Sequence, residues 1–234
     1  MNMPGPLVDA AGFPLSFRIM QPAPAQPRNL LVLLHGVGGN ETNLAALAAR
    51  VGPDTLVVLP RGPIALGPEA FGWFRVAFTG EGPRIVASEA EASRRTLIEF
   101  VAQLQADHGI DAARSVIAGF SQGGILSASV ALSSPETVAG FAVLAGRILP
   151  ELEPQIVEPA RLSRLHGFIA HGRLDDKLPV DWAQRADAWL TRLGVAHQTR
   201  LYPAGHALDA AMQHDFLGWF QNIAGHRNAA TVAD

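Results

Sequence analysis

The chain has 234 residues, of which 48% are hydrophobic and 17% are charged, and its formal net charge is -3. This length and apolar content suit one domain over residues 1–234, with flexible ends at residues 1–12 and 225–234. The small net charge, without a run of like charges, argues against nucleic acid as a partner. The absence of cysteine excludes disulfides, thiolate metal sites and cysteine nucleophiles.

The start of the chain gives no sign of a targeting segment. Residues 1–11 lack the basic start and the apolar stretch of a signal peptide. No segment approaches the run of about 18 apolar residues that indicates a membrane-spanning helix. We therefore expect a cytoplasmic protein without stable membrane insertion.

Short apolar runs bounded by turn residues predict strands along the whole chain. They are residues 13–20, 30–35, 56–59, 115–118, 138–144, 167–171 and 198–202. Two of these runs, at residues 30–34 and 116–118, do not alternate with polar residues. Such runs are typical of parallel strands that helices cover on both faces, so we expect these two to be central.

Helical patterns lie between the predicted strands. Apolar residues recur on one face of residues 88–108, and Ser88 with Glu91 predicts a capping box at the start of this helix. Two further helices are predicted, one after Pro179 and one over residues 208–223. Strands alternating with helices predict an α/β fold, with a mostly parallel central sheet and helices on both faces.

A serine motif lies between one predicted strand and the helix that follows it. Residues 119–123 read Gly-Phe-Ser-Gln-Gly, which is the pattern G-x-S-x-G. A sharp strand-to-helix turn strains its central residue and projects the serine hydroxyl into a cleft, and the glycines leave room for neighbouring chain. The bare pattern also occurs by chance in unrelated loops. Its position between strand and helix favours Ser121 as a nucleophile.

An alcohol is a poor nucleophile at neutral pH, so Ser121 needs a base that a carboxylate orients. His206 follows the last predicted strand, which places it at the same sheet edge as Ser121, and it is the best candidate among the eight histidines. The alternative is a loop histidine bound only to water. Asp175 and Asp176 follow the preceding strand. We choose Asp175 as the acid, but the pattern does not separate the two, and the alternative for Asp176 is a helix cap.

Acyl transfer also needs two backbone N–H groups that stabilise the developing oxyanion. One belongs to Gln122, the residue after the nucleophile, and the other is expected at Val37 in the glycine-rich loop after an early strand. This loop lacks the spacing and the Lys-Ser/Thr ending of a phosphate-binding loop. No metal-ligand spacing occurs in the sequence, so we expect neither a metal nor another cofactor.

Several strings occur in the same order as in one known family. They are HGVGGNE at 35–41, RGP at 61–63, GWF at 72–74, GFSQGG at 119–124, HG at 171–172 and GH at 205–206. Together they resemble the phospholipase/carboxylesterase family of the α/β-hydrolase fold, which is similar to the acyl-protein thioesterases. The resemblance implies a small, nearly lidless hydrolase of carboxylic esters, with thioesters or lysophospholipids as further substrates. It places Ser121, Asp175 and His206 at the triad and Val37 and Gln122 at the oxyanion hole. It also allows a homodimer.

The resemblance further indicates where a substrate would bind. Trp73 and Phe74 match a loop beside the acyl site of the family, and they lie in residues 62–83, which predict a long irregular pocket wall. Their alternative role is that of simple hydrophobic anchors. Leu149 is a third expected substrate contact. Close to it, Arg147 departs from the family pattern, and a charge near the acyl pocket would disfavour long-chain substrates.

Two other functions are compatible with the same residues. A lactonase or a small peptidase is the nearest alternative, because one fold carries many substrates. The alternative of a different class is a non-catalytic ligand-binding protein on a hydrolase scaffold. The complete set of triad candidates argues against it, since binding alone does not require all three.

Overall fold

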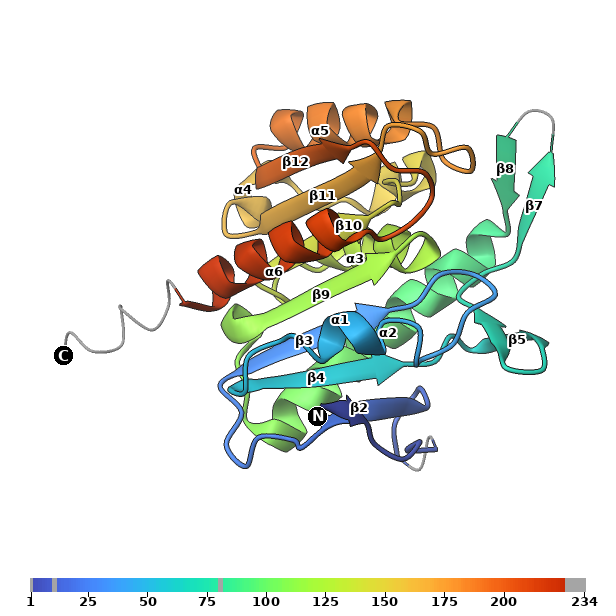
Figure 1. Cartoon of the computed structure of the whole chain (residues 1–234). Coiled ribbons are helices and arrows are strands. Elements are labelled where there is room, and N and C mark those ends of the chain that lie inside the picture. The colour runs from blue at the N-terminus through green and yellow to red at the C-terminus, as the bar shows by residue number, and fades with distance from the viewer. Residues whose placement is uncertain (1, 10–11, 80–81, 226–234) are drawn as a thin grey trace.

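The computed structural model describes residues 2–9, 12–79 and 82–225, and its centre is an eight-stranded sheet with the order β1-β2-β4-β3-β9-β10-β11-β12 (Figure 1). The strands are β1 (Met3–Pro4), β2 (Phe17–Gln21), β3 (Asn29–Leu34), β4 (Thr55–Pro60), β9 (Ser115–Phe120), β10 (Gly140–Leu144), β11 (His166–Gly172) and β12 (Ala196–Tyr202). The pairs β1–β2 and β2–β4 are antiparallel, and all other neighbours in this sheet are parallel. This arrangement confirms the predicted α/β fold with a mostly parallel sheet.

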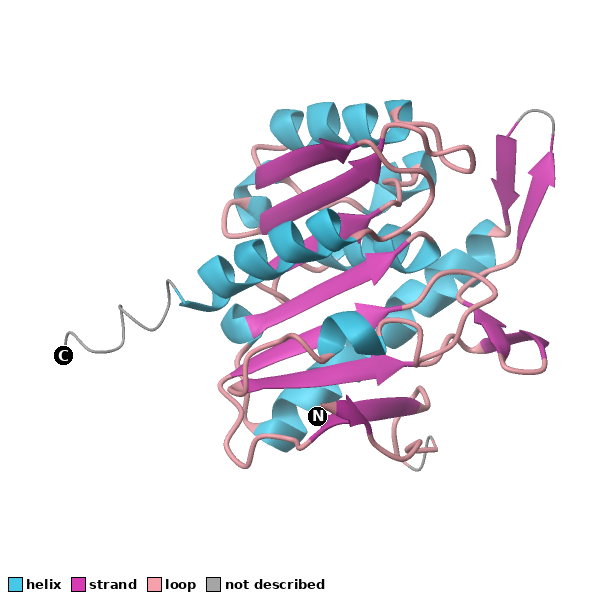
Figure 2. Cartoon of the chain, viewed as in Figure 1, coloured by secondary structure: helices cyan, strands magenta, loops and turns pink. Residues whose placement is uncertain are grey.

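Helices cover both faces of the sheet (Figure 2). They are α1 (Ala45–Ala48), α2 (Ala87–His108), α3 (Gln122–Ser133), α4 (Pro159–Leu162), α5 (Asp181–Arg192) and α6 (Ala210–Gly225), with short 3-10 helices η1 (Ala112–Arg114) and η2 (Pro150–Gln155). On β3, Leu30 and Val32 belong to the apolar cluster of the face that α2, α3 and α5 cover, whereas Leu31 and Leu33 belong to the cluster of the face that α1 and α6 cover. The unbroken apolar run in β3 therefore has the predicted cause, which is burial on both faces.

The predicted capping box at the start of α2 is wrong. The helix begins at Ala87, its N-cap is Val86, and no side chain caps it. The Glu91 carboxylate instead pairs with Arg94 at 2.7 Å and with Arg95 at 2.6 Å. Residues three and four positions apart face each other on a helix, so these two cations compete for the carboxylate that a capping box would need.

The segment at residues 62–83 is more regular than predicted. It contains two hairpins, β5 (Ile64–Gly67) with β6 (Ala70–Gly72) and β7 (Val76–Thr79) with β8 (Gly82–Ile85). The first hairpin is fixed to the glycine-rich loop, because Gly38 N donates to Phe71 O at 2.8 Å and Phe71 N donates to Gly39 O at 2.7 Å. The second projects from the body of the molecule (Figure 1). The described part of this segment therefore forms two hairpins instead of a long irregular connection.

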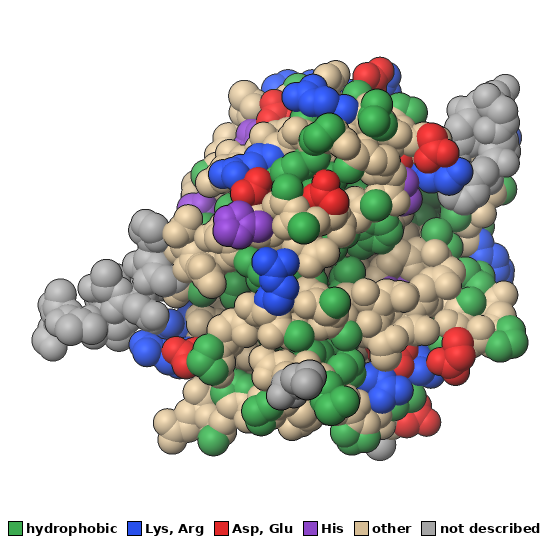
Figure 3. All heavy atoms as spheres, viewed as in Figure 1, with side chains coloured by type: hydrophobic (Ala, Val, Ile, Leu, Met, Phe, Trp, Pro, Cys, Tyr) green, Lys and Arg blue, Asp and Glu red, His purple; other side chains and the backbone are tan. Residues whose placement is uncertain are grey.

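The N-terminal segment of the described residues pairs with the edge of the sheet. Met3–Pro4 pairs with β2, and Gly5 N donates to Ile19 O at 2.9 Å, within the range 1–12 that was expected to be flexible. Val8 also pairs with Phe17, and Gly225 is the last residue of α6. Residues 1, 10–11 and 226–234 of the two expected ranges lie outside the described residues. Of the helices described, none combines the length and apolar content that crossing a membrane requires. On the face shown in Figure 3, acidic and basic side chains are interspersed.

A buried carboxylate links the antiparallel edge of the sheet to the glycine-rich loop. Glu41, with a side chain only 1% exposed, lies 2.9 Å from Arg18 of β2 and 2.7 Å from Arg61 after β4. Burial alone raises the pKa of Glu41, but the hydrogen bonds from Arg61 and Arg18 outweigh it and lower the pKa to about 2. The loop after β3 is thus held at one end by an ion-pair network.

We expect Glu41→Gln to lower the free energy of unfolding by about 3 kcal/mol at neutral pH, because it leaves two arginines without their shared carboxylate. The folded-state pKa of Glu41 is below its ordinary value of 4.5. Its stabilisation is therefore present above pH 4.5 and is lost as the pH falls toward 2. Urea unfolding at a series of pH values should show the difference between variant and wild type shrinking in that window. Glu99→Gln, at an exposed position of α2, is the control, and an equal effect of both variants would contradict the prediction.

Candidate active site

The serine of the G-x-S-x-G motif occupies a strained turn between β9 and α3. Ser121 has φ 52° and ψ -114°, a region that residues with a side chain rarely adopt. Its N–H donates to Leu144 O of the neighbouring β10 at 2.8 Å, and its own carbonyl accepts from Ile125 N at 3.1 Å. The strand, turn and helix predicted around this motif are all present, and they direct the side chain away from the sheet.

Two glycines allow this turn to pack against its neighbours. A Cβ atom on Gly119 would overlap the backbone of Gly123, and a Cβ atom on Gly123 would overlap the carbonyl oxygen of Leu34 in β3. Any larger residue at either position would push α3 away from the sheet. The glycines of the motif are therefore required by close packing of backbone on backbone.

Ser121, His206 and Asp175 form a continuous chain of polar contacts. His206 Nε2 lies 3.0 Å from Ser121 Oγ, and His206 Nδ1 lies 2.7 Å from Asp175 Oδ2. Since an ionised carboxylate only accepts hydrogen bonds, Nδ1 carries the proton and Nε2 is free to accept from the serine hydroxyl. The three residues follow β9, β12 and β11, so the carboxyl ends of parallel strands bring them together.

The structure separates the two adjacent aspartates. Asp175 is buried, and its Oδ1 accepts from the backbone N–H groups of Lys177 at 2.9 Å and Leu178 at 2.8 Å. The Asp176 side chain is 73% exposed and pairs with Lys177 at 3.2 Å, an interaction that lowers the pKa of Asp176. Asp176 does not cap α5 either, because the N-cap is Val180 and no side chain caps it. Asp175 is therefore the carboxylate that reaches His206.

A second buried histidine lies beside this carboxylate. His171 Nε2 is 2.7 Å from Leu178 O and 3.4 Å from Asp175 Oδ2. The contact with a carbonyl requires a proton on Nε2, which leaves Nδ1 as a buried acceptor without a partner. The sequence pattern alone does not indicate this contact between His171 and Asp175. Its position at the end of the strand that leads to the aspartates was the available signal.

The two expected oxyanion donors border the same space as Ser121 and His206. Among the backbone hydrogen bonds of the described residues, neither the Val37 nor the Gln122 N–H donates to a carbonyl. The glycine-rich loop owes its shape to Gly38, which has φ +76° and donates to Phe71 O. Both amides are thus available to a ligand at the serine.

The Gln122 side chain has a role that the sequence analysis missed. Its Oε1 accepts from Trp73 N at 2.7 Å, and its Nε2 donates to Phe74 O at 2.6 Å. These bonds fix the loop before β7 against the serine turn. Trp73 is fully buried behind the cavity, where its Nε1 donates to His35 O at 2.9 Å, which corrects the expected substrate contact. Phe74 does line the cavity.

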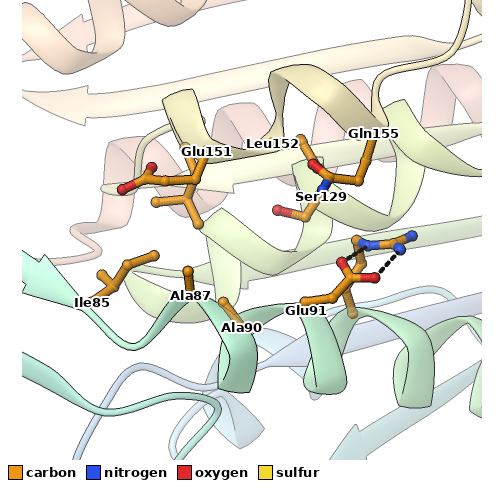
Figure 4. Close-up of a pocket in the computed structure, with 10 residues that line it drawn as sticks. Ile85, Ala87, Ala90, Glu91, Ser129, Glu151, Leu152 and Gln155 are labelled. Atoms are coloured by element: carbon orange, nitrogen blue, oxygen red, sulfur yellow. Dashed lines mark hydrogen bonds and ion pairs between the residues drawn. The ribbon is translucent and has the colours of Figure 1, made fainter.

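The cavity at Ser121 has a volume of about 260 Å³. Besides the residues above it is lined by Phe120, Val76, Ile85, Ile125 and Leu178 and by the cations Arg147 and Lys177. Leu149 is absent from this lining. It borders a separate hollow of about 90 Å³, which corrects the third expected contact. Figure 4 shows this hollow, with Ala90 and Glu91 of α2 on one side and Glu151 and Leu152 of η2 on the other. Among the described residues, no group of three or more His, Asp or Glu side chains could hold a metal ion.

Comparisons with known proteins find similar esterases and thioesterases. The chain is 30% identical to the esterase YpfH of Escherichia coli over 193 residues, which is 80% of this chain and 78% of that protein. It is 26% identical to acyl-protein thioesterase 1 of Emericella nidulans over 194 residues, covering 72% and 78% of the two chains. A crystal structure of a carboxylesterase from Mesorhizobium loti superposes with a TM-score of 0.78 at 25% identity, covering 92% of this chain and 97% of that one.

The model of one family, Phospholipase/Carboxylesterase, matches residues 16–220. This match covers both ends of the parallel sheet and every residue of the candidate site. It confirms the resemblance on which the sequence analysis relied. The chain belongs to the phospholipase/carboxylesterase family of α/β-hydrolases, whose members include carboxylesterases and thioesterases.

Proposed function

We propose that the protein hydrolyses small carboxylic esters, thioesters included, through an acyl-enzyme on Ser121. The observation that carries this proposal is the contact chain from Asp175 Oδ2 to His206 at 2.7 Å and from His206 to Ser121 Oγ at 3.0 Å. Such a chain is what a hydroxyl nucleophile requires. The names of the esterase and thioesterase relatives support an ester or thioester as the substrate class.

Each contact has a task in the proposed two-step reaction. His206 Nε2 takes the Ser121 proton while Oγ attacks the acyl carbon, and the Val37 and Gln122 amides stabilise the oxyanion. Asp175 stabilises the imidazolium. The intermediate then collapses, the leaving alcohol or thiol takes the proton from His206, and the acyl group stays on Ser121. Water repeats the sequence on the acyl-enzyme and releases the carboxylic acid.

The size of the cavity favours short substrates. Its volume of about 260 Å³ lies just below the range of about 300–1,000 Å³ that is usual for small-molecule sites. Phe74, Ile125 and Leu178 supply an apolar wall, whereas Arg147 places a charge within it. A charge in the cavity wall disfavours long apolar acyl chains, so short-chain esters are the proposed substrates.

We expect Ser121→Ala to abolish turnover of a p-nitrophenyl ester series, because no other hydroxyl lies within hydrogen-bonding distance of His206 among the described residues. A residual rate of at most about a thousandth of wild type is expected. Ser163→Ala, at an exposed position of α4's C-cap, is the matched control and should keep full activity. A wild type that neither hydrolyses any ester nor reacts with a fluorophosphonate would point instead to the ligand-binding alternative.

We expect Asp175→Asn to reduce kcat by roughly a thousandfold to ten-thousandfold with little change in KM, because an amide no longer holds the required tautomer of His206. Asp176→Asn changes the same functional group one residue later, on an exposed side chain. Its kcat should stay within about twofold of wild type. Steady-state kinetics on a short p-nitrophenyl ester compares the two, and a larger loss in Asp176→Asn would refute the assignment.

A further inference from the structure

One guanidinium lies at the candidate active site without a counterion. Arg147 follows β10, lines the cavity at Ser121 and is only 5% exposed. Its Nε is buried and has no hydrogen-bond acceptor. In the part of the chain that the structure describes, no carboxylate lies within ion-pair distance of Arg147. Among the described residues, Arg147 is therefore a buried cation that borders the cavity without a carboxylate partner.

A single aromatic contact holds the guanidinium in place. Its Cζ atom lies 4.4 Å from the centroid of the Trp182 ring in α5. Stacking of this kind occupies the flat face of the guanidinium and leaves its N–H groups, which lie in the plane, free to donate. Arg147 is thus oriented by an aromatic partner, and its two Nη groups, unlike the buried Nε, remain available to bind an anion.

In the free protein, no neighbouring anion among the described residues neutralises the buried charge of Arg147. Burial lowers the pKa of Arg147, and the negative charge of the exposed Glu151 opposes that effect only from a distance. A guanidinium stays protonated throughout the physiological range, so the charge is buried without being neutralised. Buried charges are stable when they are paired. An anion that enters the cavity would supply the missing partner.

We propose that Arg147 binds a carboxylate of the substrate, so that the preferred substrates are short esters with a carboxylate a few carbon atoms from the scissile bond. This inference rests on the proposed ester hydrolysis at Ser121. The planar fork of donors matches a carboxylate in a bidentate manner. Phe74 and Ile125 line the same cavity and would contact the short apolar link between the two groups.

Lys177 is the second cation of the cavity, but it is a weaker candidate. Its side chain is 59% exposed and its Nζ already lies 3.2 Å from Asp176. Solvent screens such an exposed pair, and the bond to Asp176 competes with any ligand. Arg147 is therefore the residue that determines the preference, and Lys177→Met should change it by no more than about threefold.

The test compares carboxylate esters with their neutral carboxamide counterparts of nearly the same shape. Monoethyl glutarate places the carboxylate on the acyl side, and 4-acetoxybutanoate places it on the alcohol side. A pH-stat assay gives kcat/KM for each ester and for its carboxamide. We expect wild type to prefer the carboxylate by roughly 10- to 100-fold in at least one of the two pairs, as for a charge-assisted hydrogen bond.

Two arginine variants identify the source of the preference. Arg147→Met keeps an unbranched apolar stem and should remove the preference while hydrolysis of the carboxamide ester continues. Arg185→Met is the matched control, because Arg185 contacts the same Trp182 ring at 5.0 Å but does not line the cavity. This control should keep the wild-type preference. Circular dichroism establishes that both variants are folded.

Equal kcat/KM for carboxylate and carboxamide in wild type would overturn the role of Arg147 and leave ester hydrolysis intact. An equal loss of preference in both arginine variants would overturn it as well. If no ester were hydrolysed, the proposed function itself would fail. Calorimetric titration of wild type with glutarate and with glutaramide would then still decide, because tighter binding of glutarate supports the anion site and equal binding refutes it.

Discussion

The position of Ser121 depends on one tightly packed turn. Its positive φ is unfavourable for a residue with a side chain, by about 1 to 3 kcal/mol, and persists only where the surrounding structure fixes it. Here β10 fixes it through the hydrogen bond from Ser121 N to Leu144 O, and β3 fixes it by packing against Gly123. Both neighbours are central strands with buried side chains. The strained residue is therefore supported by the buried centre of the sheet.

The same parallel sheet explains how distant residues meet at this turn. Ser121, Asp175 and His206 follow three parallel strands, and the carboxyl ends of such strands lie along one edge. Short loops at that edge are therefore enough to bring His206 within 3.0 Å of Ser121 and within 2.7 Å of Asp175. Helices on both faces exclude water from the sheet beneath them. The parallel sheet therefore determines both the fold and the place where the three residues of the candidate site meet.

The sequence predicted the residues whose positions follow from a local motif or from the order of elements along the chain. The G-x-S-x-G string with its strand and helix indicated Ser121, and chain order indicated His206. Adjacent residues such as Asp175 and Asp176 differ only in how one loop turns, which a pattern does not encode. Trp73 was misplaced for a related reason, since its burial follows from long-range bonds to the Gln122 side chain and to His35. Local sequence carries no record of such contacts.

The buried ionised groups of this protein differ in whether a neighbouring group compensates their charge. Glu41 has two arginine partners, and Asp175 accepts hydrogen bonds from His206 and from two backbone amides. Each of these carboxylates is neutralised or solvated by protein, as burial demands. Arg147 is also buried, yet its partner is an indole ring, which compensates charge far less than a carboxylate does. The uncompensated positive charge of Arg147 borders the cavity that holds Ser121. An anionic substrate that binds there would neutralise this charge.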